Sequence, residues 1–305
     1  MAQLIKLQNY ISRYERNIFH YPGQFSRLKK ENWQKAVTQW EDQQPSSHQN
    51  KEEDYSAEQP LAKWRTVFKR KQKEEAFETE EEKSTIPLTK EELKQRFLDH
   101  LFSFQLKWAS TTVSRMSFID RDFYYDQTLK YFLQRFPDTN LLMYRPVFYL
   151  KNSEIEGDHI IIHPHGIEII KLAEKKSAVK ITAEDERLWL VDENKTPVRF
   201  LSPMVSLKRT EQVIRSILDL YNIDFPINKI VLSRTNPIEY EREPYLTRFV
   251  DSTNHDKWLE EKRNAVSPLK HGQLKACSAL LKHCQTISVK RREWEEDDGL
   301  DTSQL

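Results

Sequence analysis

The stretch EIEGDHIIIHPHGIEIIKLAE, residues 154–174, decides the fold of this chain. Two runs of aliphatic residues flank the segment HPHG at 163–166, and a single acid, Asp158, stands at the start of the first run. Short apolar runs around a proline and glycine turn are typical of a β-hairpin with one or both faces buried. We therefore expect two paired strands here, with Asp158 opening the first of them.

The segments around the hairpin alternate between strand and helix patterns. Short apolar runs predict strands at 141–150, 178–182, 187–191, 197–200, 229–233 and 246–250. Ser202 and Pro203 form a good N-cap and first-turn pair for a long helix, and another helix is expected from about Asn254. This order is typical of an α/β sheet whose late strands are joined through a crossover helix.

The N-terminal third has the periodicity of helices. Apolar residues recur at spacings of three and four, which predicts an amphipathic first helix through Leu4, Leu7, Ile11, Tyr14 and Ile18. Further helices are predicted over 24–41, 89–114, 117–136 and 268–285. The predicted organisation is a helical region at 1–116 with a mobile linker near 42–55, an α/β domain at 117–262, a C-terminal helix at 263–292 and a disordered acidic tail at 293–305.

Composition narrows the class of protein. The 305 residues contain 48 Lys and Arg against 47 Asp and Glu, so bulk charge does not indicate a nucleic-acid binder. The first residues alternate charged and apolar side chains, unlike an export signal or a membrane span, so we expect a cytoplasmic protein without a membrane partner. Cys277 and Cys284 lie two helical turns apart, too far for a disulfide within one helix, and are expected to be reduced.

Common catalytic and binding motifs are absent from the sequence. It has no P-loop, no Gly-x-Gly-x-x-Gly, no Gly-x-Ser-x-Gly and no Cys-x-x-Cys. His159, His163 and His165 lack a further cysteine or acid to complete a metal site and are expected in a turn or at the surface. Basic residues of the crossover helix, among them Lys208, Arg209 and Arg215, are candidates for phosphate contact, and the block KRKQK at 69–73 predicts either a nucleic-acid patch or a solvated helix.

The order of elements over about 117–262 resembles the nuclease-related domain (NERD), a branch of the PD-(D/E)xK nuclease superfamily. The resemblance lies in GDHIII at 157–162, in GIEII at 166–170, in Trp189, in the pair Ser202-Pro203 and in KIVLS at 229–233. It implies a restriction-endonuclease-like α-β-β-β-α-β core with added strands, preceded here by the helical N-terminal region. It also implies that Asp158 holds the position of a metal-binding aspartate, and that the family's metal-binding glutamate on the first helix falls near Asp126.

At the positions of the family's catalytic residues this sequence has different side chains. Lys171 stands where the family has a glutamate, and Ala173 stands where it has a lysine. A cation in place of a ligand opposes Mg²⁺ at short range, so no cofactor is expected, and Mg²⁺ is expected only if activity remains. Glu168 and Glu174 are candidate substitute acids, but strand alternation directs both to the face opposite Lys171.

Three hypotheses follow for the function. The leading one is a catalytically degenerate, NERD-like protein, a pseudoenzyme that binds nucleic acid or a protein partner. The second is an active, metal-dependent nuclease with a rearranged site. The third is a structural or interaction protein with no role at nucleic acid, since a fold alone does not choose among these.

Overall fold

The computed structural model describes residues 1–42, 87–150, 152–175, 178–193, 196–265 and 267–291. The linker predicted near 42–55, beyond Asp42, lies outside these residues, as do the basic block at 69–73 and the tail predicted at 293–305. Two compact units are present, one of Met1–Lys29 with Leu98–Leu305 and one of Lys30–Phe97. The domain boundaries predicted at 116 and 262 stay predictions.

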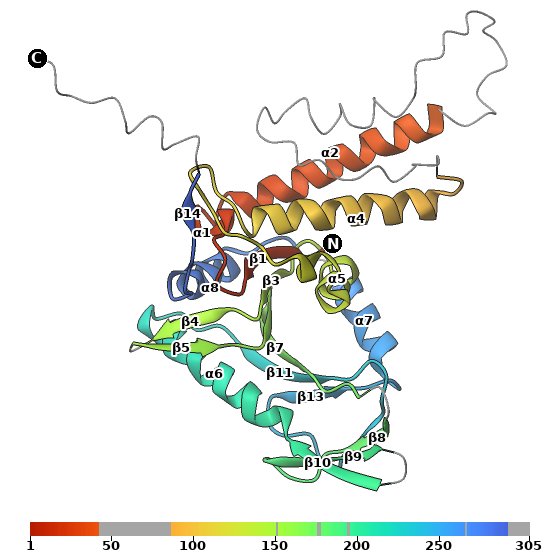
Figure 1. Ribbon diagram of the computed structural model, residues 1–305, viewed down its shortest axis with the longest axis vertical. Coiled ribbons are helices and arrows are strands. Elements are labelled where there is room, and N and C mark those ends of the chain that lie inside the picture. The colour runs from red at the N-terminus through yellow and green to blue at the C-terminus, as the bar shows by residue number, and fades with distance from the viewer. Residues whose placement is uncertain (43–86, 151, 176–177, 194–195, 266, 292–305) are drawn as a thin grey trace, which may run out of the picture. The chain divides into compact units, whose positions relative to one another are not determined.

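The first unit is built on a six-stranded mixed sheet (Figure 1). Its strands, in spatial order, are β1 (Gln3–Leu7), β3 (Leu141–Tyr144), β6 (His159–His163), β7 (Gly166–Leu172), β11 (Ile227–Leu232) and β13 (Thr247–Val250). Antiparallel pairing joins β3, β6 and β7, while the β1–β3, β7–β11 and β11–β13 pairs are parallel. The expected α/β class is therefore confirmed.

Helices cover both faces of this sheet because its strands are aliphatic on both sides. One core cluster joins Ile160, Ile162, Ile167 and Ile169 to apolar residues of α6 (Pro203–Leu220) and α8 (His271–Lys282). The other joins Ile161 and Ile170 to residues of α5 (Gln127–Arg135) and α7 (His255–Asn264). Because both faces of the sheet are covered by apolar cores, a ligand site is expected at the ends of the strands.

The long helix predicted after Ser202 is present. The Ser202 hydroxyl accepts a hydrogen bond from the Met204 N–H at 3.2 Å, and Pro203 occupies the first turn, where its missing N–H costs nothing. This helix, α6, connects β10 (Thr196–Leu201), a strand of a smaller sheet, to β11 of the large sheet and runs along the face of β7 and β11 (Figure 1). Its inward side chains therefore meet the end of β7.

Smaller elements surround the main sheet. A four-stranded sheet has the order β10 (Thr196–Leu201), β9 (Leu188–Glu193), β8 (Ala178–Thr182) and β12 (Ile238–Glu239). A hairpin pairs β4 (Val147–Leu150) with β5 (Ser153–Glu156), and β2 (Arg115–Met116) pairs with β14 (Val289–Lys290). The short helix α1 (Arg13–Arg16) follows β1, and η2 (Arg121–Tyr124) precedes α5. The predicted strands 178–182, 187–191 and 197–200 are thus confirmed within a few residues.

Two long helices belong partly to the second unit. They are α2 (Tyr21–Asp42) and α4 (Lys90–Trp108), close to the predicted 24–41 and 89–114. Within the second unit, the rings of Trp33 and Phe97 lie 5.2 Å apart. No helix of the described residues is long and apolar enough to cross a membrane.

Three sequence predictions about elements are wrong. The helix predicted through Leu4 and Ile18 is instead β1, a loop and α1, because Gln3–Leu7 pairs with β3 as a fully buried strand. The helix predicted over 117–136 begins only at Gln127, where the Asp126 carboxylate caps it. The strand predicted over 141–150 is broken at Arg145, whose φ of 47° turns the chain out of β3.

Candidate functional site

The end of the central hairpin forms a polar cavity of about 360 Å³. Asp158 immediately precedes β6 and Lys171 lies near the end of β7, and the pairing of His159 with Ile170 makes them cross-strand neighbours. The lining consists of Arg145, Glu156, Gly157, Asp158, His159, Lys171, Leu172, Ser206 and Arg209. The lining residues thus come from the consecutive strands β5, β6 and β7, from the residue after β3, and from α6, which lies farther along the chain.

Asp158 is the most enclosed acid of the cavity, with 5% of its surface exposed. Lys171 Nζ donates to its Oδ1 at 2.9 Å. The Ser206 hydroxyl lies 2.7 Å from both carboxylate oxygens, and the Thr210 hydroxyl donates to Oδ2 at 3.0 Å. Charge-assisted bonds of this kind hold the carboxylate in one orientation.

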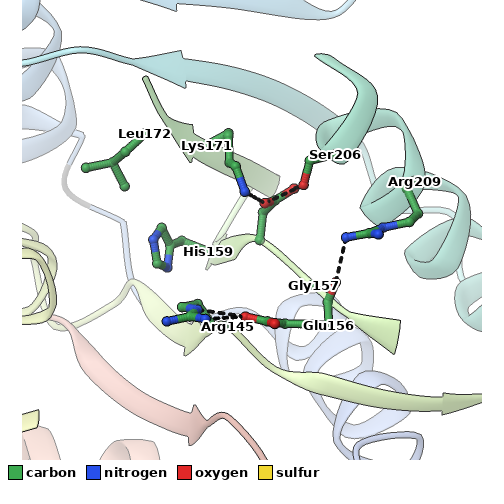
Figure 2. A pocket seen from close by; sticks show the side chains of 9 residues that line it. Arg145, Glu156, Gly157, His159, Lys171, Leu172, Ser206 and Arg209 are labelled. Carbon is green, nitrogen blue, oxygen red and sulfur yellow. Dashed lines mark hydrogen bonds and ion pairs between the residues drawn. The ribbon is translucent and has the colours of Figure 1, made fainter. Parts of the chain in front are cut away.

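Lys171 is the cation closest to Asp158. Its side chain is 42% exposed, so the ammonium is reached from solvent while it bonds the buried carboxylate. Figure 2 shows Lys171 and Ser206 converging from β7 and α6. Lys171 therefore forms a direct ion pair with Asp158.

Two arginines flank the outer part of the cavity. Arg145 Nε and Nη2 each lie 2.7 Å from Glu156 Oε1, and Arg209 Nη2 donates to the Glu156 carbonyl at 3.2 Å. Both arginines point toward Glu156 in Figure 2. The cavity therefore presents several guanidinium and ammonium donors to an anion.

His159 is buried, so the prediction of a turn or surface position is wrong for this residue, whereas His165 lies exposed in the turn as predicted. His159 is 9% exposed, and its ring stacks on Tyr144 with centroids 4.4 Å apart. Burial, together with the charges of Lys171 and Arg145, lowers its pKa to about 3. The imidazole is neutral near pH 7, and its Nδ1 has no hydrogen-bond partner among the described residues.

Asp126 does not belong to the same constellation. Its Oδ1 accepts the N–H groups of Thr128 and Leu129 at the start of α5, and its Oδ2 accepts the Tyr144 hydroxyl at 2.7 Å. The cavity lining does not include it among the described residues. The structure thus brings Asp158 and Lys171 together and leaves Asp126 as a helix cap.

The substitute acids face away from the cavity. Glu168 pairs with Lys262 of α7, and Glu174 pairs with Arg234 through bonds of 2.5 and 2.8 Å. Of the basic residues on α6, Lys208 pairs with Glu186 and Arg215 with Glu211, so Arg209 is the one of these three that lines the cavity.

Sequence reasoning missed Arg145 and Glu156 as members of the site. Arg145 directly follows β3 and Glu156 is the last residue of β5, and neither stands in a recognisable motif. The signal available beforehand was the pair Arg145-Pro146 inside an apolar run, since a residue before proline is restricted and a proline interrupts a strand.

Comparison with known proteins adds one similarity. No family model matches the chain, and no solved structure matches it. The chain is 36% identical over 114 residues to an RNA 2',3'-cyclic phosphodiesterase of Geobacillus stearothermophilus. This similarity covers 34% of the chain and 36% of that relative, so it spans about a third of either protein.

These findings correct the resemblance to the nuclease-related domain. No model of that family matches, and the detected similarity is to a phosphodiesterase of a different description. The resemblance rested on the order and spacing of elements, which unrelated α/β proteins share. The leading hypothesis built on it, a degenerate pseudoenzyme that only binds, is corrected with it, because the similarity is to an enzyme.

Proposed function

We propose that this chain is a phosphoesterase that acts on RNA, and that it opens a 2',3'-cyclic phosphate at the Asp158 cavity. One observation carries the proposal: a buried carboxylate, bonded to an exposed lysine at 2.9 Å, lies in a cavity that two arginines also line. The partial similarity to an RNA 2',3'-cyclic phosphodiesterase supports the choice of substrate class.

The cations bind the phosphate. Arg145, Lys171 and Arg209 come from three different elements and line one cavity of about 360 Å³. Guanidinium groups suit phosphate oxygens because their N–H donors are arranged as a planar fork, and an ammonium adds a point charge. These groups also oppose the negative charge that develops on phosphorus oxygens during the reaction.

Asp158 and Lys171 transfer the protons. A water molecule attacks phosphorus and loses a proton to the Asp158 carboxylate, while Lys171 donates a proton to the ribose oxygen whose bond to phosphorus breaks. The products are a terminal phosphate monoester and a free ribose hydroxyl. The proton then passes from Asp158 back to Lys171 across the 2.9 Å hydrogen bond, which restores both groups.

The donor set does not fit a resident Mg²⁺. Both Asp158 oxygens already accept hydrogen bonds from hydroxyl groups, and the Lys171 ammonium occupies the place beside Oδ1. Among the described residues no group of three or more His, Cys, Asp and Glu could hold a metal ion. Because Mg²⁺ prefers carboxylate oxygens and water, we assign the electrostatic role to Lys171, and no step passes through a metal.

The finer fold assignment is also a proposal. We propose that α5, β3, β6, β7, α6 and β11 form a restriction-endonuclease-like α-β-β-β-α-β core, with β1, β13 and the small sheet as additions. The order along the chain and the antiparallel meander followed by a helical crossover support it. Membership of a nuclease family does not follow, since one fold hosts many chemistries.

Hydrolysis of a nucleoside 2',3'-cyclic monophosphate and of an RNA oligonucleotide ending in a 2',3'-cyclic phosphate tests the function. The purified full chain should open both in EDTA, and Asp158→Asn and Lys171→Met should each lower kcat at least about 100-fold. Lys180→Met is the matched control, because Lys180 has a side chain 43% exposed and a carboxylate partner at 2.7 Å on the small sheet.

The thermal midpoint of each variant shows whether it is folded. No turnover by the wild type, in EDTA or with added Mg²⁺, contradicts the proposed reaction. Turnover that needs Mg²⁺ contradicts the role given to Lys171. If Asp158→Asn and Lys171→Met both keep wild-type turnover, the active site lies outside this cavity.

A further inference from the structure

Glu156 occupies a position in the cavity that the reaction described above does not use. Its carboxylate holds Arg145 through two contacts of 2.7 Å, and its carbonyl holds Arg209 at 3.2 Å. The Arg145 and Glu156 side chains are 48% and 50% exposed, so water and small anions reach them. An acid therefore sits between the two arginines that we assign to phosphate binding.

The geometry of this pair is set by the backbone. Arg145, which precedes Pro146, has a φ of 47°. This is a left-handed backbone conformation that residues other than glycine seldom adopt. Such conformations cluster at functional sites, where the surrounding structure maintains them. Here it ends β3 and directs the guanidinium toward Glu156 (Figure 2).

The charge of the lining is set by a small number of groups. The cations Arg145, Lys171 and Arg209 face the carboxylates Glu156 and Asp158, and one net positive charge remains. His159 adds none near pH 7, since burial keeps its ring neutral. The cavity therefore neutralises a ligand of one negative charge.

Substrate and product of the proposed reaction differ in charge. A cyclic phosphate is a diester with one negative charge, whereas a terminal monoester has a second pKa near 6 and carries nearly two at neutral pH. The second negative charge of the monoester would lie beside Arg145 and Arg209, which already bond to Glu156. A carboxylate at this position disfavours the dianion more than the monoanion because like charges repel at short range.

We infer that Glu156 is a selectivity residue that sets the cavity for phosphodiester monoanions and against phosphomonoester dianions, so that product leaves the site. The inference rests on the proposed function. Glu156 makes no bond to the reacting atoms, and it acts through Arg145 and Arg209.

Binding of two unreactive probes at pH 7.5 tests this role. A nucleoside 3',5'-cyclic monophosphate supplies the monoanion, and the matching nucleoside 3'-monophosphate supplies the dianion. We expect Glu156→Gln to tighten binding of the monoester about tenfold and of the cyclic diester less than about threefold. At pH 5, where the monoester is a monoanion, the two ligands should gain equally.

Glu154→Gln is the control, because Glu154 lies two residues away on β5 and bonds Gln285 outside the cavity lining. A Glu156→Gln variant with unchanged relative affinities contradicts the inference, and so does an equal gain for both probes at pH 7.5. If the wild type hydrolyses the cyclic phosphate but Glu156→Gln binds the two probes with unchanged selectivity, the role of Glu156 is refuted and the proposed reaction stands. A change of selectivity in a protein that hydrolyses nothing removes the reaction alone.

Discussion

Lys171 Nζ lies 2.9 Å from Asp158 Oδ1, across the neighbouring antiparallel strands β7 and β6. The lysine side chain is 42% exposed and the aspartate side chain 4% exposed, so one partner reaches solvent while the other is buried. Hydroxyl groups of α6 complete the shell of the carboxylate. The helix that joins β10 to β11 is therefore as much a part of the site as the hairpin.

Thr210→Val should destabilise the protein by about 1–3 kcal/mol, because it leaves a buried carboxylate short of a donor. The Thr210 hydroxyl donates to Asp158 Oδ2 at 3.0 Å and lies 3.2 Å from the Asp158 N–H, which donates to it. Denaturant unfolding measures the effect. Ser216→Ala on the same helix is the control, since its exposed hydroxyl donates to the Gln212 carbonyl of that helix. Equal losses for the two variants would refute the buried role of Thr210.

Arg145→Gly should be more stable than Arg145→Ala by roughly 1 kcal/mol, because glycine adopts the left-handed conformation without a steric cost. Both variants lose the guanidinium and should hydrolyse a cyclic phosphate more slowly than the wild type. Paired measurements of the thermal midpoint and of kcat/KM separate the two effects. An alanine variant as stable as the glycine variant would show that the φ of 47° is not strained.

The stability of the protein should fall as pH drops from about 6.5 to 3, because His159 is buried and neutral. Burial lowers its pKa to about 3 in the folded protein, while an unfolded chain binds the proton near pH 6.5. The unfolded state therefore binds more protons between these values, and the stabilisation present above pH 6.5 is lost as pH falls. Its size is on the order of 2 kcal/mol between pH 6.5 and pH 5.

Urea unfolding at pH 7 and pH 5 measures this loss in the wild type and in His159→Phe. The variant has no imidazole to titrate, so its free energy of unfolding should change less over the same interval. The comparison uses slopes with pH, which makes it independent of any packing defect in the variant. Equal slopes in the two proteins would assign the acid sensitivity to other groups.

Glu15→Gln should cost about 3 kcal/mol, since it leaves the fully buried Lys6 ammonium without its carboxylate. Lys6 Nζ lies 2.5 Å from Glu15 Oε1 and also bonds the Tyr10 carbonyl and the Thr286 hydroxyl. Glu261→Gln is the control, because its pair with Arg248 is about half exposed and should contribute much less than the buried Lys6–Glu15 pair. Chemical denaturation reports both values, and a loss below 1 kcal/mol for Glu15→Gln would mean that water reaches Lys6.

Local patterns in the sequence predicted the parts of the fold that local forces determine. The cap at Ser202 and the hairpin around Gly166 are of this kind, and the pairing of that hairpin brings Asp158 and Lys171 side by side. The course of Gln3–Leu7 was not predictable in this way. Its apolar spacing fits a helix, and only pairing with β3, far along the chain, makes it a strand.

The outer half of the site depends on contacts that no local pattern encodes. Arg145 and Glu156 form an ion pair because β3 and β5 end close together in the fold. The sequence on either side of each residue does not predict this contact. The class of reaction was harder to predict than the fold. The order of elements alone favoured a nuclease family that the comparisons do not support. Geometry of side chains, more than order of elements, carries the proposal of a phosphoesterase.

The edge strand β1 has a consequence for how the protein is made. It is synthesised well before its partner β3, which begins at Leu141, and Lys6 bonds the hydroxyl of Thr286, which is synthesised later still. Contacts of such long range make folding slow and leave an apolar, strand-forming segment exposed in the meantime. The segment Gln3–Leu7 is thus exposed during synthesis until β3 is available, although it is fully buried in the folded protein.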